Sequence, residues 1–148
     1  MKENALIGRK DIIDLPELEL FNVVAKIDTG AYGNALHCHK MKVVEVDGKK
    51  ILQFNVLDPS HPEYKEHIYH SENFRTKEVK SSIGHKEKRY VIKTVLQIFG
   101  KKYKTEFSLT NRKNMRHPIL IGRKFLSKKF LVDVNAKNLS YTIKTQKK

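Results

Sequence analysis

The chain is poor in the residues and segments that cross-link or anchor a protein. It has a single cysteine, Cys38, which excludes a disulfide within the chain and is typical of a reducing compartment. No apolar run approaches the roughly 18 residues that span a bilayer. Residues 1–16 contain three acidic residues and no continuous apolar stretch, unlike a signal peptide. We therefore expect a cytoplasmic protein with no membrane partner.

Proline and glycine are also scarce, at 4 and 7 of the 148 residues. No Pro/Gly/Ser-rich linker and no internal repeat divides the chain, whose length is ordinary for one domain. The mean hydropathy is −0.55, but 7 Phe, 6 Tyr and many β-branched residues can supply a core and argue against disorder. We expect a single folded domain over residues 1–148.

Acidic residues are rare in one half only. Residues 73–148 hold 21 Lys and Arg against 4 Asp and Glu, a net charge of +17, whereas residues 1–72 have a net charge of −3. A positive field of this strength attracts anions such as nucleic acid, an acidic peptide or an anionic membrane surface. Because the basic residues are scattered among apolar ones, an equally good explanation is that they form the solvated faces of strands.

Short alternating segments separated by turns predict a mostly β domain, a small barrel or sandwich. Strands are expected at residues 21–27, 41–46, 51–57, 90–99, 103–109, 130–134 and 139–143. Asp47-Gly48 is the strongest short hairpin signal in the chain, and further turns are expected at residues 100–101 and 135–138. Helix is expected only at residues 123–129.

Several common catalytic motifs are missing. The chain has no P-loop, no His-Glu-x-x-His zinc motif and no Gly-x-Ser-x-Gly nucleophile motif, and Cys38 lacks a protease signature. His37 and His39 would share one face of a strand. A zinc site needs three or four ligands at defined spacing, and no such set is present. We expect no metal and no cofactor.

Asp28 directly follows an apolar strand and opens the string Asp-Thr-Gly-Ala. A carboxylate at the exit of a buried strand is costly unless it is paired or used, and the small residues after it leave room for another backbone. The same string is equally typical of a turn that ends a strand. A second segment, residues 117–126, indicates an apolar strand, then Gly122-Arg123, then a short helix.

Together these two segments resemble the retropepsin-like aspartic proteases. The chain is similar above all to a bacterial and archaeal subfamily that carries the label ATP-dependent zinc protease and is associated with RimK. Residues 79–92 resemble the hairpin that covers the active site in these enzymes, the flap, with Gly84 at its tip. The resemblance covers about residues 6–141. It implies a retropepsin-like closed or partly open β-barrel with a flap hairpin and one short helix after Gly122-Arg123.

The resemblance implies an aspartic endopeptidase that works as a homodimer. The chemistry needs two carboxylates, and the chain has one Asp-Thr-Gly, so Asp28 would pair with its copy in a second chain. The implied catalytic residues are Asp28, Thr29 and Gly30. The implied substrate-binding residues are Ala31, Tyr32, Ser82, Ile83 and Gly84. Gly122 and Arg123 would support the catalytic loop from beneath.

The chain departs from the subfamily directly after this motif. Tyr32-Gly33-Asn34 stand where the subfamily commonly has Arg-Thr-Ser, so a cation that could bind a substrate carboxylate is missing. In the retroviral enzymes the Gly-Arg arginine pairs with an acid just after Asp-Thr-Gly-Ala. No Asp or Glu occurs here between Ala31 and Val44, so the sequence predicts no partner for Arg123.

The expected substrate is a peptide or protein that is acidic. The RimK label links these proteases to ligases that append glutamates, and the basic half of the chain includes flap residues Lys80, Lys86, Lys88 and Arg89. Two other functions stay open. One is a catalytically silent retropepsin-like dimer that binds peptides. The other is a basic nucleic-acid-binding β-barrel, which is disfavoured because no RNP-like aromatic motif supports it.

Overall fold

The computed structural model describes residues 5–80, 83–111 and 116–146. In chain order its elements are β1 Ala5–Ile7, β2 Lys10–Leu15, the 3-10 turn η1 Pro16–Leu18, β3 Leu20–Ile27, β4 Asn34–Val46, β5 Lys49–Val56, β6 Tyr69–Ser71, β7 Phe74–Lys80, β8 Lys86–Ile98, β9 Lys101–Thr110, β10 Ile119–Ile121, α1 Arg123–Leu126, β11 Phe130–Val132 and α2 Leu139–Gln146. The predicted mostly β fold is confirmed.

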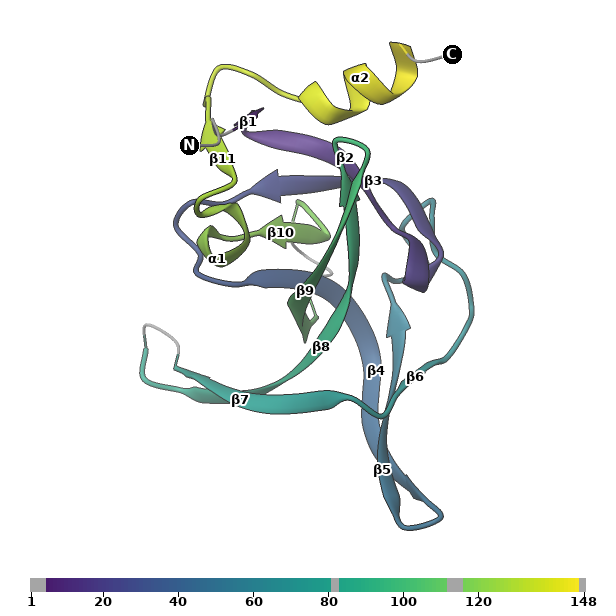
Figure 1. The fold of residues 1–148 in the computed structure, drawn as a ribbon. Coiled ribbons are helices and arrows are strands. Elements are labelled where there is room, and N and C mark those ends of the chain that lie inside the picture. The colour runs from purple at the N-terminus through teal and green to yellow at the C-terminus, as the bar shows by residue number, and fades with distance from the viewer. Residues whose placement is uncertain (1–4, 81–82, 112–115, 147–148) are drawn as a thin grey trace.

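Part of the sheet closes on itself as a ring (Figure 1). Its strands follow the order β10, β3, β2, β8, β9 and β4, and β10 then pairs with β4 to complete the circuit. Strand β10 runs parallel to β3 and antiparallel to β4, so this short strand joins the two ends of the ring. This arrangement agrees with the expected barrel-like retropepsin fold.

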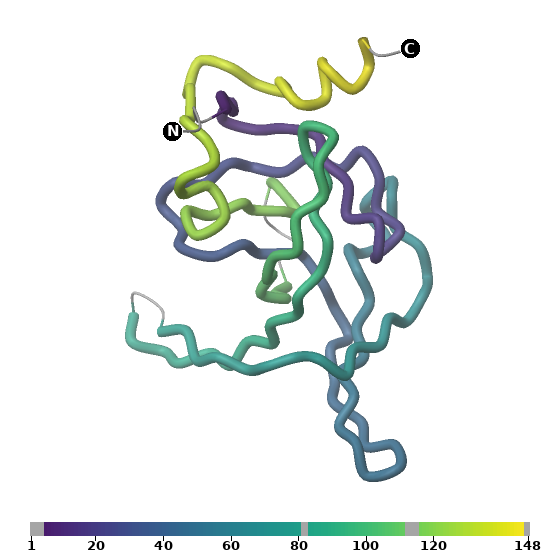
Figure 2. The backbone as a smooth tube through the Cα atoms, in the orientation of Figure 1, coloured from purple at the N-terminus to yellow at the C-terminus, as the bar shows by residue number. Residues whose placement is uncertain are grey.

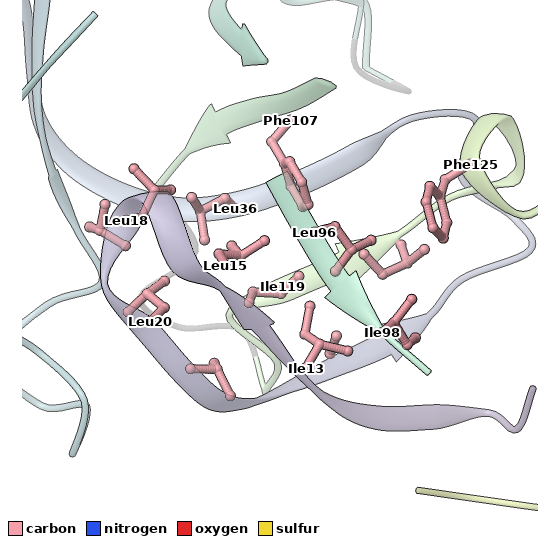
Figure 3. Close-up of a cluster of buried hydrophobic side chains, with 14 of the residues drawn as sticks. Ile13, Leu15, Leu18, Leu20, Leu36, Leu96, Ile98, Phe107, Ile119 and Phe125 are labelled. Carbon is pink, nitrogen blue, oxygen red and sulfur yellow. The ribbon is translucent and has the colours of Figure 1, made fainter. Parts of the chain in front are cut away.

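The ring encloses the apolar core (Figure 3). Side chains from β2, β4, β8, β9 and β10 meet inside it, each at most 2% exposed: Ile13, Leu15, Leu36, Leu96, Phe107 and Ile119. In β3, Val23, Ala25 and Ile27 are buried at alternate positions, as a half-buried strand requires. This packing brings the end of β3, and therefore Asp28, to the edge of a rigid core.

Two long hairpins extend beyond the ring (Figure 2). Strands β4 and β5 form the predicted hairpin, with positive φ angles at Asp47 and Gly48, as a type I′ turn requires. Strands β7 and β8 form the expected flap hairpin, paired from Phe74↔Ile92 out to Lys80↔Lys86. Near its tip Gly84 has φ +87, which is readily adopted only by glycine.

The predicted last hairpin, residues 130–134 with 139–143, is wrong. Strand β11 pairs in parallel with β1, and residues 139–146 form helix α2. The Asp11 carboxylate, from β2, accepts hydrogen bonds from the backbone N–H groups of Ser140 at 2.9 Å and Tyr141 at 3.1 Å. This distant acid satisfies donors in the first turn of α2 and favours a helix over the strand that the alternation of residues 139–143 suggests.

Smaller differences concern turn and helix limits. Strands β8 and β9 pair as far as Ile98↔Lys101, so the turn lies at residues 99–100, not 100–101. Helix α1 ends at Leu126, earlier than the predicted residue 129. Neither helix in the described part of the chain is long and apolar enough to cross a membrane.

Candidate active site

Asp28 lies in a tight loop at the end of β3. Its backbone N–H donates to the carbonyl oxygen of Ile121 at 2.8 Å, which extends the pairing of β3 with β10 by one residue. The N–H of Gly30 donates to Asp28 Oδ1 at 3.0 Å, and the N–H of Ala31 donates to the Asp28 carbonyl at 3.2 Å. The bond from Gly30 orients the carboxylate, and the other two fix the backbone of the loop. The Asp28 side chain is partly exposed and can therefore reach a second group or a water molecule.

Gly122 and the start of α1 hold the following residues by backbone hydrogen bonds. The N–H of Arg123 donates to the carbonyl of Ala31, and the N–H of Lys124 donates to that of Tyr32, both at 2.8 Å. A Cβ at Gly122 would lie 2.4 Å from the carbonyl oxygen of Gly33, so only glycine allows this approach. The Gly-Arg segment therefore supports the Asp28 loop directly.

The side chain of Arg123 has two partners that the sequence did not predict. Its Nη1 donates to the carbonyl oxygen of Thr29 at 3.0 Å. Its guanidinium also lies 6.0 Å from the centre of the Tyr32 ring, within cation–π range. A backbone carbonyl and an aromatic ring thus take the role of the acid that pairs with this arginine in the retroviral enzymes.

The structure brings Asp28, Thr29, Gly30, Ala31 and Tyr32 together with Gly122 and Arg123. It does not bring the flap tip to them within a single chain. Ile83 is 80% exposed, and a Cβ built on Gly84 would meet no other atom within 4 Å. Ser82 lies outside the described residues, so its predicted contact with substrate stays a prediction.

A basic cleft opens beside the loop, which the sequence did not predict. It has a volume of about 230 Å³. Its walls are Tyr32, Gly33, Asn34, Arg75, Lys77, Val91, Lys93, Lys104, Thr105, Glu106, Ser108 and Lys124. A hydrogen bond from Arg75 lowers the pKa of Glu106 to about 2, so this acid is ionised at neutral pH. Burial and nearby cations, Arg75 first among them, lower the pKa of Lys77.

The histidines considered as metal ligands have other partners. Nε2 of His37 lies 2.5 Å from Oδ2 of Asp58, and Nδ1 of His39 lies 2.5 Å from the carbonyl oxygen of Leu57. The hydroxyl of Ser60 also donates to Asp58 and is the main cause that lowers the pKa of this carboxyl to about 2. Within residues 5–80, 83–111 and 116–146, no group of three or more His, Cys, Asp or Glu side chains could hold a metal ion.

Comparison with known families gives a match over most of the chain. A model of the RimB-like family, described as retropepsin-like aspartic endopeptidase RimB, matches residues 6–142. The chain belongs to this family. The match includes the Asp28 loop, the flap hairpin and the Gly122-Arg123 segment, so it confirms the resemblance seen in the sequence.

Curated relatives place the same domain within longer proteins. Proteins of Shewanella pealeana and Shewanella halifaxensis, each named "Probable alpha-L-glutamate ligase", are 33% identical to this chain over 129 residues. The match covers 86% of this chain and 28% of each relative. A crystal structure of a Legionella pneumophila protein of unknown function is similar with a TM-score of 0.69 and 26% identity, over 93% of this chain and 99% of that one.

Proposed function

We propose that the chain is an aspartic endopeptidase that acts as a homodimer and prefers acidic peptides. The observation that carries this proposal is the Asp28 loop. Its carboxylate is oriented by the Gly30 N–H, and the loop is fixed from beneath by Gly122 and Arg123. Membership of the RimB-like family supports the same reading.

The proposed chemistry needs a second carboxylate. Two carboxylates about 3 Å apart cannot both be ionised, so they share one proton. The ionised member takes a proton from the attacking water, and the protonated member donates to the oxygen of the scissile carbonyl. A two-fold axis between two chains would supply the pair as Asp28 and the same residue of the partner. Gly30 and Ala31 are small enough to let the partner loop and the substrate backbone approach.

Apolar side chains on the β1–β11 sheet and in the cavity next to this loop favour association of two chains. Leu6 of β1 and Leu131 of β11 stand opposite each other in their sheet and are 50% and 59% exposed. Phe130 and Val132 line an open cavity of about 590 Å³ together with Thr29. Exposed apolar groups that adjoin a site mark protein interfaces. The Thr29 side chain lies at this surface, where it can hydrogen-bond to the partner loop.

The preference for acidic substrates is supported by the distribution of charge. Residues 73–148 have a net charge of +17, and the flap hairpin and the walls of the basic cleft belong largely to this half. An anionic peptide would be attracted to this surface, mainly through its association rate, and the attraction would weaken as salt screens the charges. The named ligase relatives fit a substrate rich in glutamate, because a ligase that appends glutamates makes such chains.

The test is hydrolysis of glutamate-rich and glutamine-rich peptides by the wild type and by Asp28→Asn, followed by mass spectrometry. Asn keeps the shape of the side chain but cannot share the proton, so we expect cleavage by the wild type and none by the variant. Circular dichroism and thermal unfolding establish that the variant is folded. Full activity of Asp28→Asn, or activity lost to a chelator and restored by zinc, would contradict the aspartic mechanism. Binding without cleavage by the wild type would favour the silent peptide-binding dimer.

A further inference from the structure

We propose that the basic cleft is a carboxylate-binding subsite, in which Lys77, Lys93 and Lys104 select an acidic side chain of the substrate next to the cleaved bond. This inference rests on the proposed function, since it assigns a specificity pocket to the same site. It names the side chains that bind the charged group of the substrate, whereas the net charge of the chain points to no particular residue.

Strand register explains why so many cations face one cleft. In the β7–β8 ladder Arg75 stands opposite Val91 and Lys77 opposite Arg89, and in the β8–β9 ladder Lys93 stands opposite Glu106. Because neighbouring residues of a strand point to opposite faces, alternate residues of β7, β8 and β9 all lie on one face. The lining of the cleft shows that this face looks toward Tyr32, Gly33 and Asn34.

The walls of the cleft carry more positive than negative charge. Glu106 is the one acidic residue in these walls, and two cations already contact its carboxylate. Nε and Nη2 of Arg75 each donate to one of its oxygens at 2.9 Å, and Nζ of Lys124 lies 3.6 Å from Oε1. Across the described ranges, Lys77, Lys93 and Lys104 form no ion pair. Three uncompensated ammonium groups around one small space favour the entry of an anion.

Lys77 connects this charge to the catalytic loop. A Cβ built on Gly33 would have Nζ of Lys77 as its nearest neighbour, at 3.9 Å, and Gly33 stands only five residues after Asp28. Burial of Lys77 and the adjacent cations disfavour its charged form. A bound carboxylate would reverse this effect. The volume of about 230 Å³ lies below the about 300–1,000 Å³ of sites for whole small molecules. It suits a side chain of a substrate whose backbone lies in the active site.

The other flap cations lie on the opposite face. Lys80, Lys86 and Lys88 are exposed and alternate with the residues that line the cleft, whereas Arg89 pairs with Lys77 on the inner face. Of the four flap cations that the sequence singled out, only Arg89 therefore lies on the inner face of the hairpin, and it is not one of the residues that line the cleft. The other three are lysines on the same hairpin, with the same total charge as the three proposed subsite lysines, so they provide a matched control.

The cleft also has an acidic end. A second cavity shares Arg75, Lys93 and Lys104 with it and continues to Glu17 and Glu72. These acids repel a second carboxylate at the far end. The cleft itself therefore takes one acidic side chain close to the Asp28 loop, and the other side chains of an acidic peptide lie outside it.

The experiment compares two triple variants that each lose three positive charges. Lys77→Gln/Lys93→Gln/Lys104→Gln removes the subsite, and Lys80→Gln/Lys86→Gln/Lys88→Gln is the control on the outer face. Each is also combined with Asp28→Asn, and calorimetry measures binding of a pentaglutamate peptide and of pentaglutamine at low salt. We expect the subsite variant to bind pentaglutamate about tenfold more weakly or worse, because charge-assisted hydrogen bonds are lost. The control variant should bind within about twofold of its parent, because its three lysines lie on the opposite face of the hairpin and do not line the cleft.

Hydrolysis separates this inference from the proposed function. In the active background, the ratio of kcat/KM for glutamate over glutamine peptides should fall in the subsite variant and persist in the control. An unchanged ratio, or equal losses in both variants, would overturn the subsite while leaving the protease intact. If the wild type cleaves nothing, the proposed function fails, and binding in the Asp28→Asn background still decides the subsite. The subsite would also be overturned if inorganic phosphate and a neutral peptide with a free terminal carboxylate competed for the cleft as strongly as pentaglutamate does. The cleft would then not select acidic side chains.

Discussion

Nη1 of Arg123 donates a hydrogen bond to the carbonyl oxygen of Thr29 at 3.0 Å, from the first residue of α1 back to the centre of the Asp28 loop. The same residue donates its backbone N–H to Ala31. One residue thus fixes the loop on both sides of Gly30. The arginine acts on the geometry of Asp28 through the backbone and is a positioning residue.

Arg123→Ala should therefore loosen the loop. The variant loses one charge-assisted hydrogen bond and the contact with the Tyr32 ring, so we expect the free energy of unfolding to fall by about 1–2 kcal/mol. Arg123→Lys keeps the charge but cannot reproduce both contacts, and should recover only part of this loss. Urea unfolding measures both variants. Equal stability of wild type and Arg123→Ala would mean that the contact does not hold the loop.

Gly122→Ala should be more harmful than its small size suggests. The new methyl group would lie 2.4 Å from the carbonyl oxygen of Gly33 and 2.7 Å from that of Tyr32, and both obstacles are backbone. We expect a loss of about 2 kcal/mol or more, as for overpacking at a rigid contact. Gly33→Ala is the matched control, since its nearest neighbour is the flexible end of Lys77 at 3.9 Å. A Gly122→Ala protein as stable as the control would contradict the close approach.

Removing the Asp11 carboxylate should release α2. Asp11 is fully buried and its two oxygens accept the N–H groups of Ile12, Ser140 and Tyr141. Asp11→Ala should cost about 0.5–2 kcal/mol, as for the loss of a helix cap, and should speed amide hydrogen exchange in α2. Asp11→Asn keeps one acceptor and should lose less. Unchanged exchange at residues 142–146 in Asp11→Ala would show that packing alone holds the helix.

Acid should destabilise the fold partly through Asp58. Hydrogen bonds from Ser60, with a smaller contribution from His37, lower the pKa of Asp58 from 3.8 to about 2. A depressed carboxyl pKa stabilises the folded state above 3.8, and this contribution is lost as the pH falls from 3.8 through 2. Asp58→Asn should remove that part of the pH dependence, measured by urea unfolding between neutral pH and acid.

Asp11→Asn provides the contrast, because burial raises the pKa of Asp11. A carboxyl group whose pKa is raised in the folded state lowers the free energy of unfolding as the pH rises from 3.8 through the folded-state pKa. Asp11→Asn removes this contribution, so the stability of the variant should fall less with rising pH than that of the wild type. If both variants changed the pH dependence in the same direction, the assigned causes would be wrong.

The parts of the fold that depend on neighbouring residues were predictable from the sequence. The Asp47-Gly48 hairpin follows from local turn chemistry. The strand before Asp28 follows from the alternation of its apolar residues, which are the ones buried in the core. Helix α2 was not predictable, because the acid that caps it, Asp11, stands far away in the chain. Propensity alone leaves residues 139–143 ambiguous, and the distant contact decides.

The same distinction holds for the site. The Asp-Thr-Gly string and the Gly-Arg segment identify the loop and its support from sequence, but the partner of Arg123 is a carbonyl, which carries no sequence signal. The basic cleft was missed for another reason. Its lysines come from β8, β9 and the flap, and only the strand register tells which of them, Lys77 or Lys80, faces inward.

The most direct test of an active site shared by two chains is a mixing experiment. Wild type and Asp28→Asn are unfolded together, refolded and assayed at constant total protein on a glutamate-rich peptide. If each site needs Asp28 from both chains, an equal mixture should have about one quarter of the wild-type activity, because only dimers of two wild-type chains are active. Activity that falls to about one half, in proportion to the wild-type fraction, would mean that each chain works alone and would contradict the shared carboxylate pair.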